Sequence, residues 1–229
     1  MTRQEIITFL IWRSIGNFLV LFAVFGVFAT FGPALYFEVQ FRVLEIKGVT
    51  YTVAEKKPTS TTVAVNQSGF QAVMSNSKEQ LLVPKDTDFG IVIPKIGANS
   101  NVIPNIDASN PDDYLPALQK GVAHAKGSVF PGMKGNVYLF AHSTDNFWDV
   151  GRYNAIFYLL KDLTPGDDVT VFFENVRHNY TVTQTKIVDP DEVSYLTHSH
   201  TGGEEQLILQ TCWPPGTSWK RIIVVAKPK

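Results

Sequence analysis

An uncharged stretch of 24 residues, from Ser14 to Phe37, most constrains how this chain can fold. As a helix it would rise roughly 36 Å, more than the roughly 30 Å that the hydrocarbon core of a bilayer requires. Helices buried in a soluble core are rarely this long and this apolar on every face. No A-x-A-like cleavage site follows the stretch, so it predicts an uncleaved membrane anchor rather than a removed signal peptide.

The charges beside the anchor do not decide its orientation. Arg3 and Arg13 precede it, while Arg42 and Lys47 follow it closely, so the local Lys/Arg count is a tie. Long domains are translocated largely regardless of such charges. We therefore expect a single-pass cell-membrane protein whose N-terminus is inside and whose following domain is extracellular.

The rest of the sequence divides into segments that differ in composition and in the pattern of their apolar residues. We expect a short tail at 1–13, the anchor at 14–37, a stalk at 38–85 and a folded domain at 86–229. The 48 stalk residues would span roughly 40 Å if flexible. They contain two short alternating pieces, Val49 to Val53 and Thr61 to Val65, and folding of part of the segment against the domain is the alternative.

The last 144 residues read as a mainly β domain. Short strand-like runs recur there, interrupted by small helical pieces such as Pro111 to Leu118 and Arg152 to Lys161. Many short strands with few helices are typical of a closed or nearly closed β-barrel. The formal net charge is -1, so the sequence has no basic footprint for nucleic acid, and we expect no nucleic-acid partner.

The one cysteine, Cys212, ends an apolar run that a Pro-Pro-Gly turn separates from a second run opening with Arg221. Two such runs predict two strands, with a thiol at the end of one and a guanidinium at the start of the next. A cysteine beside a cation is where a thiolate is favoured. The alternative is a buried cysteine that serves as a small hydrophobe.

A cysteine nucleophile needs a proton-transfer partner, and His142 is the best candidate because it follows the apolar run Val137 to Ala141. His124 is second, at another predicted strand end. His198 and His200 suggest a metal site, but no third ligand accompanies them at a recognisable spacing. We therefore predict no metal and no cofactor.

Three segments together resemble the sortase family of membrane-anchored cysteine transpeptidases. The run Leu209-Gln210-Thr211-Cys212 is similar to the end of the family's T-L-x-T-C strand, with Ile208 where threonine is common. Arg221 resembles the arginine of the next strand. The stretch from Pro131 to His142 resembles the family's P-G-x-x-G-N segment ending in histidine. Smaller echoes are Ile93-Pro94-Lys95-Ile96 and Leu163-Thr164-Pro165-Gly166-Asp167.

This resemblance implies a sortase-type closed barrel of about eight strands. It also implies that Cys212 attacks a backbone carbonyl of an LPxTG-like sorting signal, that His142 transfers protons, and that Arg221 holds the peptide or stabilises the oxyanion. Thr211 and Trp213 are the candidate substrate-binding residues, although either can instead be a packing residue of its strand or loop. The implied partners are secreted proteins bearing the signal and an amine acceptor such as a cell-wall precursor.

Two other functions stay open from the sequence. A cysteine hydrolase would use the same groove and resolve the intermediate with water. The second is a catalytically silent, membrane-tethered peptide-binding module. The presence of Cys212, His142 and Arg221 argues against it, because binding alone would not require all three. Within the family, no second apolar span follows Val225 and no long insertion precedes Leu207, so we expect a class A, D or E-like enzyme that anchors surface proteins to the cell wall.

Overall fold

The computed structural model describes residues 3–54, 79–143, 156–197, 203–215 and 217–229. The chain separates into two compact units, Met1–Arg42 and Val43–Lys229.

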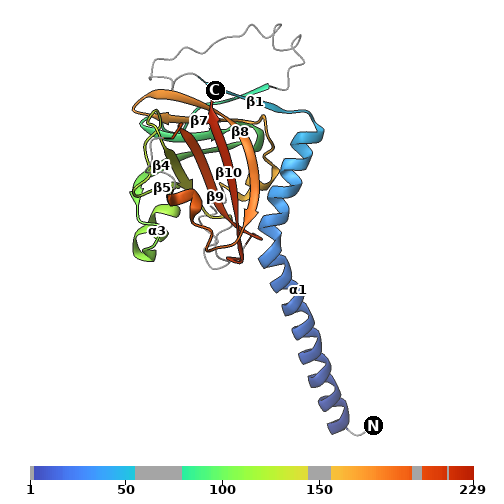
Figure 1. Ribbon diagram of the computed structural model, residues 1–229. Coiled ribbons are helices and arrows are strands. Elements are labelled where there is room, and N and C mark those ends of the chain that lie inside the picture. The colour runs from blue at the N-terminus through green and yellow to red at the C-terminus, as the bar shows by residue number, and fades with distance from the viewer. Residues whose placement is uncertain (1–2, 55–78, 144–155, 198–202, 216) are drawn as a thin grey trace, which may run out of the picture. The chain divides into compact units, whose positions relative to one another are not determined.

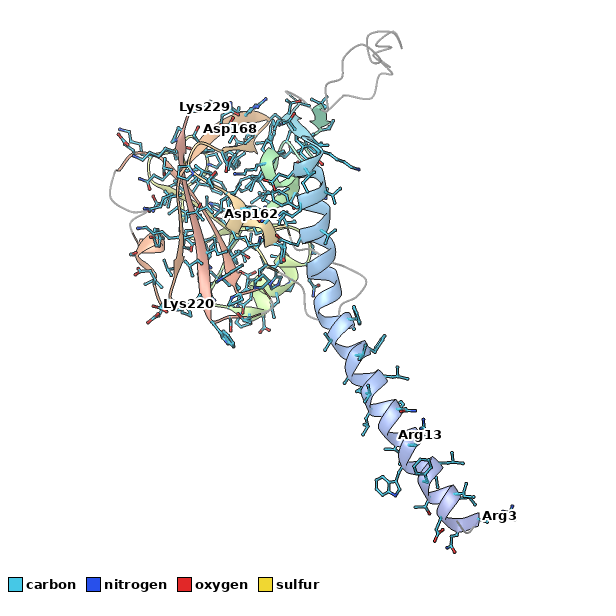
Figure 2. All side chains as sticks on the ribbon, turned by 90° about the vertical axis from the view of Figure 1, so that its right-hand side faces the viewer. Arg3, Arg13, Asp162, Asp168, Lys220 and Lys229 are labelled. Atoms are coloured by element: carbon cyan, nitrogen blue, oxygen red, sulfur yellow. The ribbon has the colours of Figure 1, made fainter. Side chains whose placement is uncertain are left out.

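The first unit belongs to helix α1, which covers Arg3–Ile46 and is 44 residues long. Its stretch Arg3–Ala29 is long and apolar enough to cross a membrane. Side chains such as Phe18, Leu21 and Phe25 are exposed along it, and none of the residues in its most apolar window is buried. Figure 2 labels Arg3 and Arg13 on the same helix. The segment expected as an anchor, 14–37, is thus helical throughout, and the helix extends beyond it at both ends.

The second unit is built around a closed barrel with the strand order β10-β8-β7-β3-β4-β5-β6-β9 (Figure 1). Neighbouring strands are antiparallel except for two parallel pairs, β4 with β5 and β6 with β9. The strands are β3 (Phe89–Ile93), β4 (Ala98–Ile106), β5 (Val122–Ala125), β6 (Asn136–Phe140), β7 (Asp168–Phe173), β8 (Val176–Val188), β9 (Gln206–Trp213) and β10 (Lys220–Pro228). The expectation of a closed, mainly β barrel of eight strands preceded by an apolar helix is confirmed.

Alternate residues of each strand fill the barrel. Leu207 and Leu209 of β9 are fully buried, and the register sets them opposite Val137 and Leu139 of β6, which are also fully buried. Directly opposed residues point to the same side of a sheet, so these four side chains share the interior face. Burying each such side chain contributes about 1.5–3 kcal/mol. The intervening residues Ile208, Gln210 and Cys212 consequently belong to the outer face of β9.

Small helices cover the connections between strands. Helix α3 (Pro111–Leu118) begins after Asn110, whose side-chain oxygen accepts a hydrogen bond from Asp112 N at 3.1 Å, and it coincides with the helix predicted there. The 3-10 helices are η1 (Pro94–Ile96) and η2 (Tyr158–Asp162), and α4 (Ser194–Thr197) is a single turn. The first half of the helix expected at 152–161 lies outside the described residues.

Both ends of the expected stalk segment are folded. Strands β1 (Thr50–Val53) and β2 (Glu79–Leu82) pair in parallel, and β1 confirms the strand expected at Val49 to Val53. Arg177 of β8 donates a hydrogen bond to Val53 O at 3.4 Å, and Asn99 of β4 donates one to Val83 O at 2.7 Å. These bonds tie residues before the barrel to its strands. The second expected strand, at 61–65, lies outside the described residues.

The two smaller sequence echoes meet in space. Lys95 of η1 forms a salt bridge of 2.8 Å with Asp167, which also accepts a hydrogen bond from the backbone N–H of Thr164 at 2.6 Å. This salt bridge joins η1 to the loop just before β7, two segments about 70 residues apart in sequence. These echoes are therefore architectural parts of the barrel.

His124 of β5 is fully buried on the interior face and stacks on Phe130 at a ring-centroid distance of 4.6 Å. Its Nδ1 accepts a hydrogen bond from Asn105 N at 3.3 Å, and its Nε2 lies 3.1 Å from Val129 O. These contacts suit one neutral tautomer, in which Nε2 carries the proton. Burial lowers the pKa of His124, outweighing the bond to Val129, so the folded barrel resists protonation there.

We predict that acid destabilises the barrel through His124. The unfolded chain binds a proton at this residue more readily than the folded chain. The His124 contribution is therefore complete above the ordinary histidine pKa of about 6.5 and is lost as the pH falls from there toward the lower folded pKa. Urea unfolding followed by tryptophan fluorescence across this range measures the effect. His124→Phe should flatten this part of the profile and cost about 1–3 kcal/mol at neutral pH, because the Asn105 N–H loses its acceptor. An unchanged pH profile in His124→Phe would show that other groups cause the acid sensitivity. The control variant is His178→Gln, which should keep the wild-type pH profile.

Candidate active site

Cys212 and Arg221 lie directly opposite each other across the antiparallel pair of β9 and β10. Opposed residues of this kind have Cα atoms about 4.5–5.5 Å apart and side chains on the same side of the sheet. Both residues are half-buried, and Cys212 is a free thiol. The expectation of two strands, with the thiol at the end of one and the guanidinium at the start of the next, is confirmed, and the register adds that the two residues are paired.

The turn between the strands orients the Arg221 guanidinium. Its Nη1 donates hydrogen bonds to Ser218 O at 3.0 Å and to Lys220 O at 3.1 Å. A guanidinium has five N–H donors, so this anchoring by one nitrogen leaves most of the fork for another acceptor. In Figure 2, Lys220 lies at one end of the barrel, whereas Lys229 and Asp168, an ion pair of 3.1 Å, lie at the other end. The Cys212–Arg221 pair is therefore at the Lys220 end.

His142 follows the end of β6, which runs parallel to β9 with Phe140 opposite Gln210. Two hydrogen bonds continue this pairing beyond the strand. Ala141 N donates to Gln210 O at 3.2 Å, and Thr211 Oγ1 donates to Ala141 O at 2.9 Å. The residues that precede His142 and Cys212 are thus bonded to each other. His142 itself is half-buried just after the last paired residue of β6, and its position beside Cys212 stays a prediction.

The outer face next to Cys212 carries a polar pair. The hydroxyl of Tyr138 on β6 donates a hydrogen bond to Oε1 of Gln210, which lies two residues before Cys212 on the same face. Tyr138 is only 2% exposed, and burial raises its pKa, although the positive charge of Arg221 opposes the rise. The phenol is therefore a neutral hydrogen-bond donor at physiological pH. The sequence pattern did not indicate Tyr138. Once β6 and β9 are paired, however, the even-numbered residues 138, 210 and 212 lie on the same face of the sheet.

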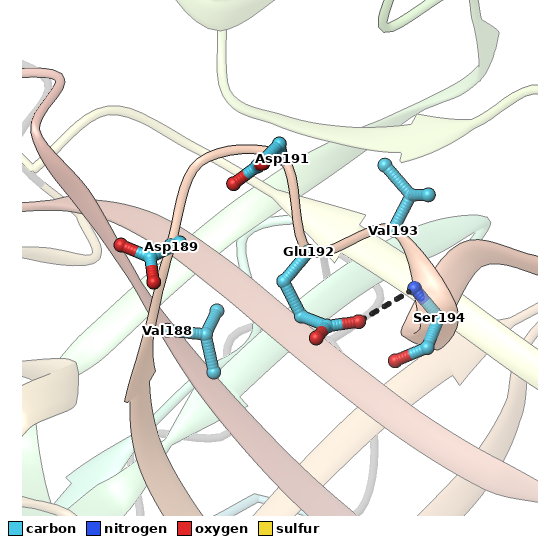
Figure 3. Close-up of a pocket in the computed structure, with 6 residues that line it drawn as sticks. All are labelled: Val188, Asp189, Asp191, Glu192, Val193 and Ser194. Atoms are coloured by element: carbon cyan, nitrogen blue, oxygen red, sulfur yellow. Dashed lines mark hydrogen bonds between the residues drawn. The ribbon is translucent and has the colours of Figure 1, made fainter.

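The connection from β8 to β9 begins beside this site, because Val188 is opposite Arg221 and the next residue, Asp189, forms an ion pair with Lys220. Glu192 accepts a hydrogen bond from Ser194 N at 3.1 Å, and this bonding lowers the pKa of Glu192 (Figure 3). A pocket of about 670 Å³ lies along the connection and is lined by Val188, Asp189, Asp191, Glu192, Val193 and Ser194.

The rest of the Pro131–His142 segment is structural. Gly132 has a φ of +86°, and a Cβ there would lie 3.0 Å from a ring atom of His178. Its N–H donates to Glu205 Oε1 at 2.8 Å, and the Tyr180 hydroxyl donates to the same oxygen at 2.5 Å. Asn136 donates to Tyr195 O at 3.1 Å, which fixes α4 to β6. Glu205 thus accepts two hydrogen bonds, from Gly132 and from Tyr180.

The remaining candidates are distributed as follows. Thr211 is buried and bonded to Ala141, Trp213 is partly buried against the core and opposite Lys220, and their binding of substrate stays a prediction. His124 is inside the barrel, away from the outer face. His198 and His200 lie outside the described residues. Among the residues that the structure describes, no group of three or more His, Cys, Asp or Glu side chains is placed to hold a metal ion.

The fold and the site define a class of protein, a closed mixed barrel that presents a cysteine, an arginine and a histidine at three neighbouring strand ends. Residues 91–229 match the family model of the sortase domain, and the chain belongs to the sortase family. It is 33% identical over 138 residues to Sortase D of Bacillus subtilis (strain 168), covering 59% of this chain and 60% of that protein. The chain thus matches less than two thirds of the length of this curated relative.

Solved structures share the fold at lower identity. A lid mutant of Sortase A from Corynebacterium diphtheriae has a TM-score of 0.51 and 21% identity, covering 63% of this chain and 70% of that one. A pilus-related Sortase C of Group B Streptococcus has a TM-score of 0.52 and 24% identity over 63% and 68% of the two chains. At these identities, the comparison supports the barrel architecture alone.

We predict that the hydroxyl of Thr211 holds the two strand ends of the site together. Thr211→Val keeps the shape of the side chain but leaves Ala141 O without this donor, which should lower the free energy of unfolding by about 1–2 kcal/mol. It should also speed hydrogen exchange at the Ala141 amide. Thr211→Ser should restore most of both quantities.

The matched control is Thr183→Val, because Thr183 Oγ1 also donates to a carbonyl, Val225 O at 3.1 Å, at an exposed position. Its loss should be smaller, since water replaces the exposed bond. Equal stability of Thr211→Val and Thr211→Ser would contradict a holding role for the hydroxyl.

Proposed function

We propose that this sortase-family chain is a membrane-anchored cysteine transpeptidase that cleaves an LPxTG-like sorting signal and joins the new C-terminus to an amine. The observation that supports the proposal is the register that pairs Cys212 with Arg221, together with the bonds that join Ala141, the residue before His142, to β9. A nucleophile, a proton-transfer group and a fixed cation at neighbouring strand ends are the parts that acyl transfer needs.

In the proposed reaction, the Cys212 thiolate attacks the carbonyl carbon at the cleaved peptide bond and forms a tetrahedral oxyanion. Arg221 stabilises that oxyanion or holds the peptide with the part of its fork that the turn does not use. His142 gives a proton to the leaving amine as the C–N bond breaks, and a thioester remains on Cys212. The acceptor amine then attacks the thioester, His142 takes its proton, and the thiolate leaves.

The relative named Sortase D favours a D-like member among the class A, D and E-like types. Secreted proteins that carry the signal are the proposed donors, and an amine of a cell-wall precursor is the proposed acceptor. Surface-protein anchoring to the cell wall is therefore the proposed role. Neither a metal nor a cofactor takes part in the proposed reaction.

The experiment is intact-mass spectrometry of the full chain in detergent micelles with a library of LPxTG-like peptides. The full chain is the right material because Val53 and Val83, which precede the barrel, bond to barrel residues. We expect a peptide adduct on Cys212 that oligoglycine or a diamine converts to a ligated product. Cys212→Ala should form no adduct.

Two arms of this experiment separate the roles of the residues. Arg221→Lys keeps the charge but loses the planar fork and should slow adduct formation by roughly 100-fold, whereas Lys220→Ala, the neighbouring cation, should have little effect. An adduct that disappears only by reaction with water would favour the hydrolase. If the protein is folded but Cys212 reacts with no peptide and no thiol reagent, the transpeptidase proposal is wrong and the alternative function, a peptide-binding module, is favoured.

We also propose that α1 anchors the protein as a single span, with the N-terminus inside and the barrel on the extracellular side. Its apolar stretch Arg3–Ala29, which is 27 residues long, supports this. We expect the full chain to stay in membranes during alkaline carbonate extraction and a chain lacking residues 3–29 to be released. Protease added to spheroplasts should digest the barrel domain. A domain degraded only after the membrane is opened would reverse the proposed orientation.

A further inference from the structure

We propose that Gln210, held by Tyr138, is a specificity-determining residue that donates a hydrogen bond to an oxygen-bearing side chain, Asp, Asn, Glu or Gln, near the cleaved bond of the sorting signal. The proposal rests on the transpeptidase function proposed above and names a feature of its substrate.

Gln210 occupies the outer face in line with the nucleophile. It lies two residues before Cys212, which is about 7 Å along a strand. Its neighbours across the sheet on this face are Phe140 of β6 and Ile223 of β10, which are 7% and 1% exposed. Gln210 itself is half-buried, so it is a polar and partly accessible position in an otherwise apolar row. A peptide whose carbonyl reaches Cys212 and whose chain is extended has a residue at the same spacing.

Tyr138 fixes how the Gln210 amide is presented. The phenol is almost fully buried, remains protonated, and donates its only proton to Gln210 Oε1. The amide oxygen is therefore occupied, and the NH₂ group is turned away from Tyr138. Within the part of the chain that the structure describes, no acceptor pairs with that NH₂ group. The side chain thus offers two N–H donors from an orientation that a buried group maintains.

Peptide binding would remove water from these donors. An apolar side chain placed over them leaves them without acceptors, whereas a carbonyl or carboxylate oxygen restores the lost bonds, so the site discriminates by the polarity of one residue. Arg221 strengthens the preference for oxygen, because its positive charge acts on this part of the face, as its influence on Tyr138 shows. The substrate class is therefore a sorting signal with an oxygen-bearing residue about two positions from the cleaved bond.

The test uses the full chain in micelles and peptides in which each position within three residues of the cleaved bond carries Leu, Asn or Asp in turn. Leu and Asn are close in size, so their ratio of kcat/KM isolates the hydrogen bond. We expect the wild-type protein to prefer Asn or Asp over Leu by about tenfold at one position, the worth of one such bond. Gln210→Leu should abolish or invert the preference at that position only, and Gln210→Glu should disfavour Asp there.

Two further variants separate specificity from stability. Tyr138→Phe keeps the buried ring but frees the amide to rotate, and it should reduce the preference to about two- to threefold. Gln184→Leu makes the same replacement at an exposed position of β8 and should leave the preference unchanged. Identical preference profiles in wild type and Gln210→Leu would overturn the proposal.

Binding of the same peptides to Cys212→Ala, followed by fluorescence anisotropy, keeps this inference separate from the transpeptidase proposal. A preference in binding that Gln210→Leu removes, together with no adduct on the wild-type protein, would support the role of Gln210 and overturn the transpeptidase. If adducts form but their rates show no preference that depends on Gln210, the transpeptidase proposal is supported and the role of Gln210 is overturned.

Discussion

The pairing of β9 on both of its edges is the constraint on which the site depends. One edge runs antiparallel to β10 and sets Cys212 opposite Arg221, while the other runs parallel to β6 and directs the chain toward His142. Because ladder register in a sheet with a buried face is strongly specified, a shift of one residue would turn the hydrophobic face of β9 outward. The core that favours the register therefore also fixes the backbone on which Cys212 is paired with Arg221 and from which the chain continues to His142.

The pairing with β6 would end at the strand terminus without the bonds of Ala141. Its N–H is bonded to Gln210 O and its carbonyl to the Thr211 hydroxyl, so the backbone just before His142 is restrained from both sides. A buried bond of this kind is costly to lose because the carbonyl has no water to replace the donor. Thr211 thus restrains the backbone next to the candidate site, whereas Gly132 and Asn136 of the same motifs bond to Glu205 and Tyr195.

The sequence was sufficient to predict the parts of the molecule that depend on local pattern. The strands that end within one residue of Cys212 and Ala141, the helix at Pro111–Leu118 and the long apolar helix all follow from runs of residues whose period or flanking residues are visible. Contacts between segments remote in sequence were beyond such reasoning. One example is the hydrogen bond from Arg177 to Val53 O. Another is Glu205, which accepts hydrogen bonds from Gly132 and Tyr180. Both depend on residues that are close only in the folded chain, so no local sequence pattern predicts them. The two residues that donate to the Glu205 carboxylate precede it by 73 and 25 positions.

Alternation along β9 separates the side chains that fill the barrel from those that share the face of the proposed nucleophile, Cys212. Leu207, Leu209 and Thr211 point inward, where a change in volume or polarity disturbs the core, while Gln210 and Cys212 point outward. A substitution at position 210 therefore alters what lies beside the nucleophile without entering the packed interior. The same reasoning makes Tyr138 more constrained than its partner, since it must fill space against Ile208 and also donate a proton to Gln210. In the proposed role of Gln210, substrate preference changes through this one outward residue while the register that places Cys212 remains intact.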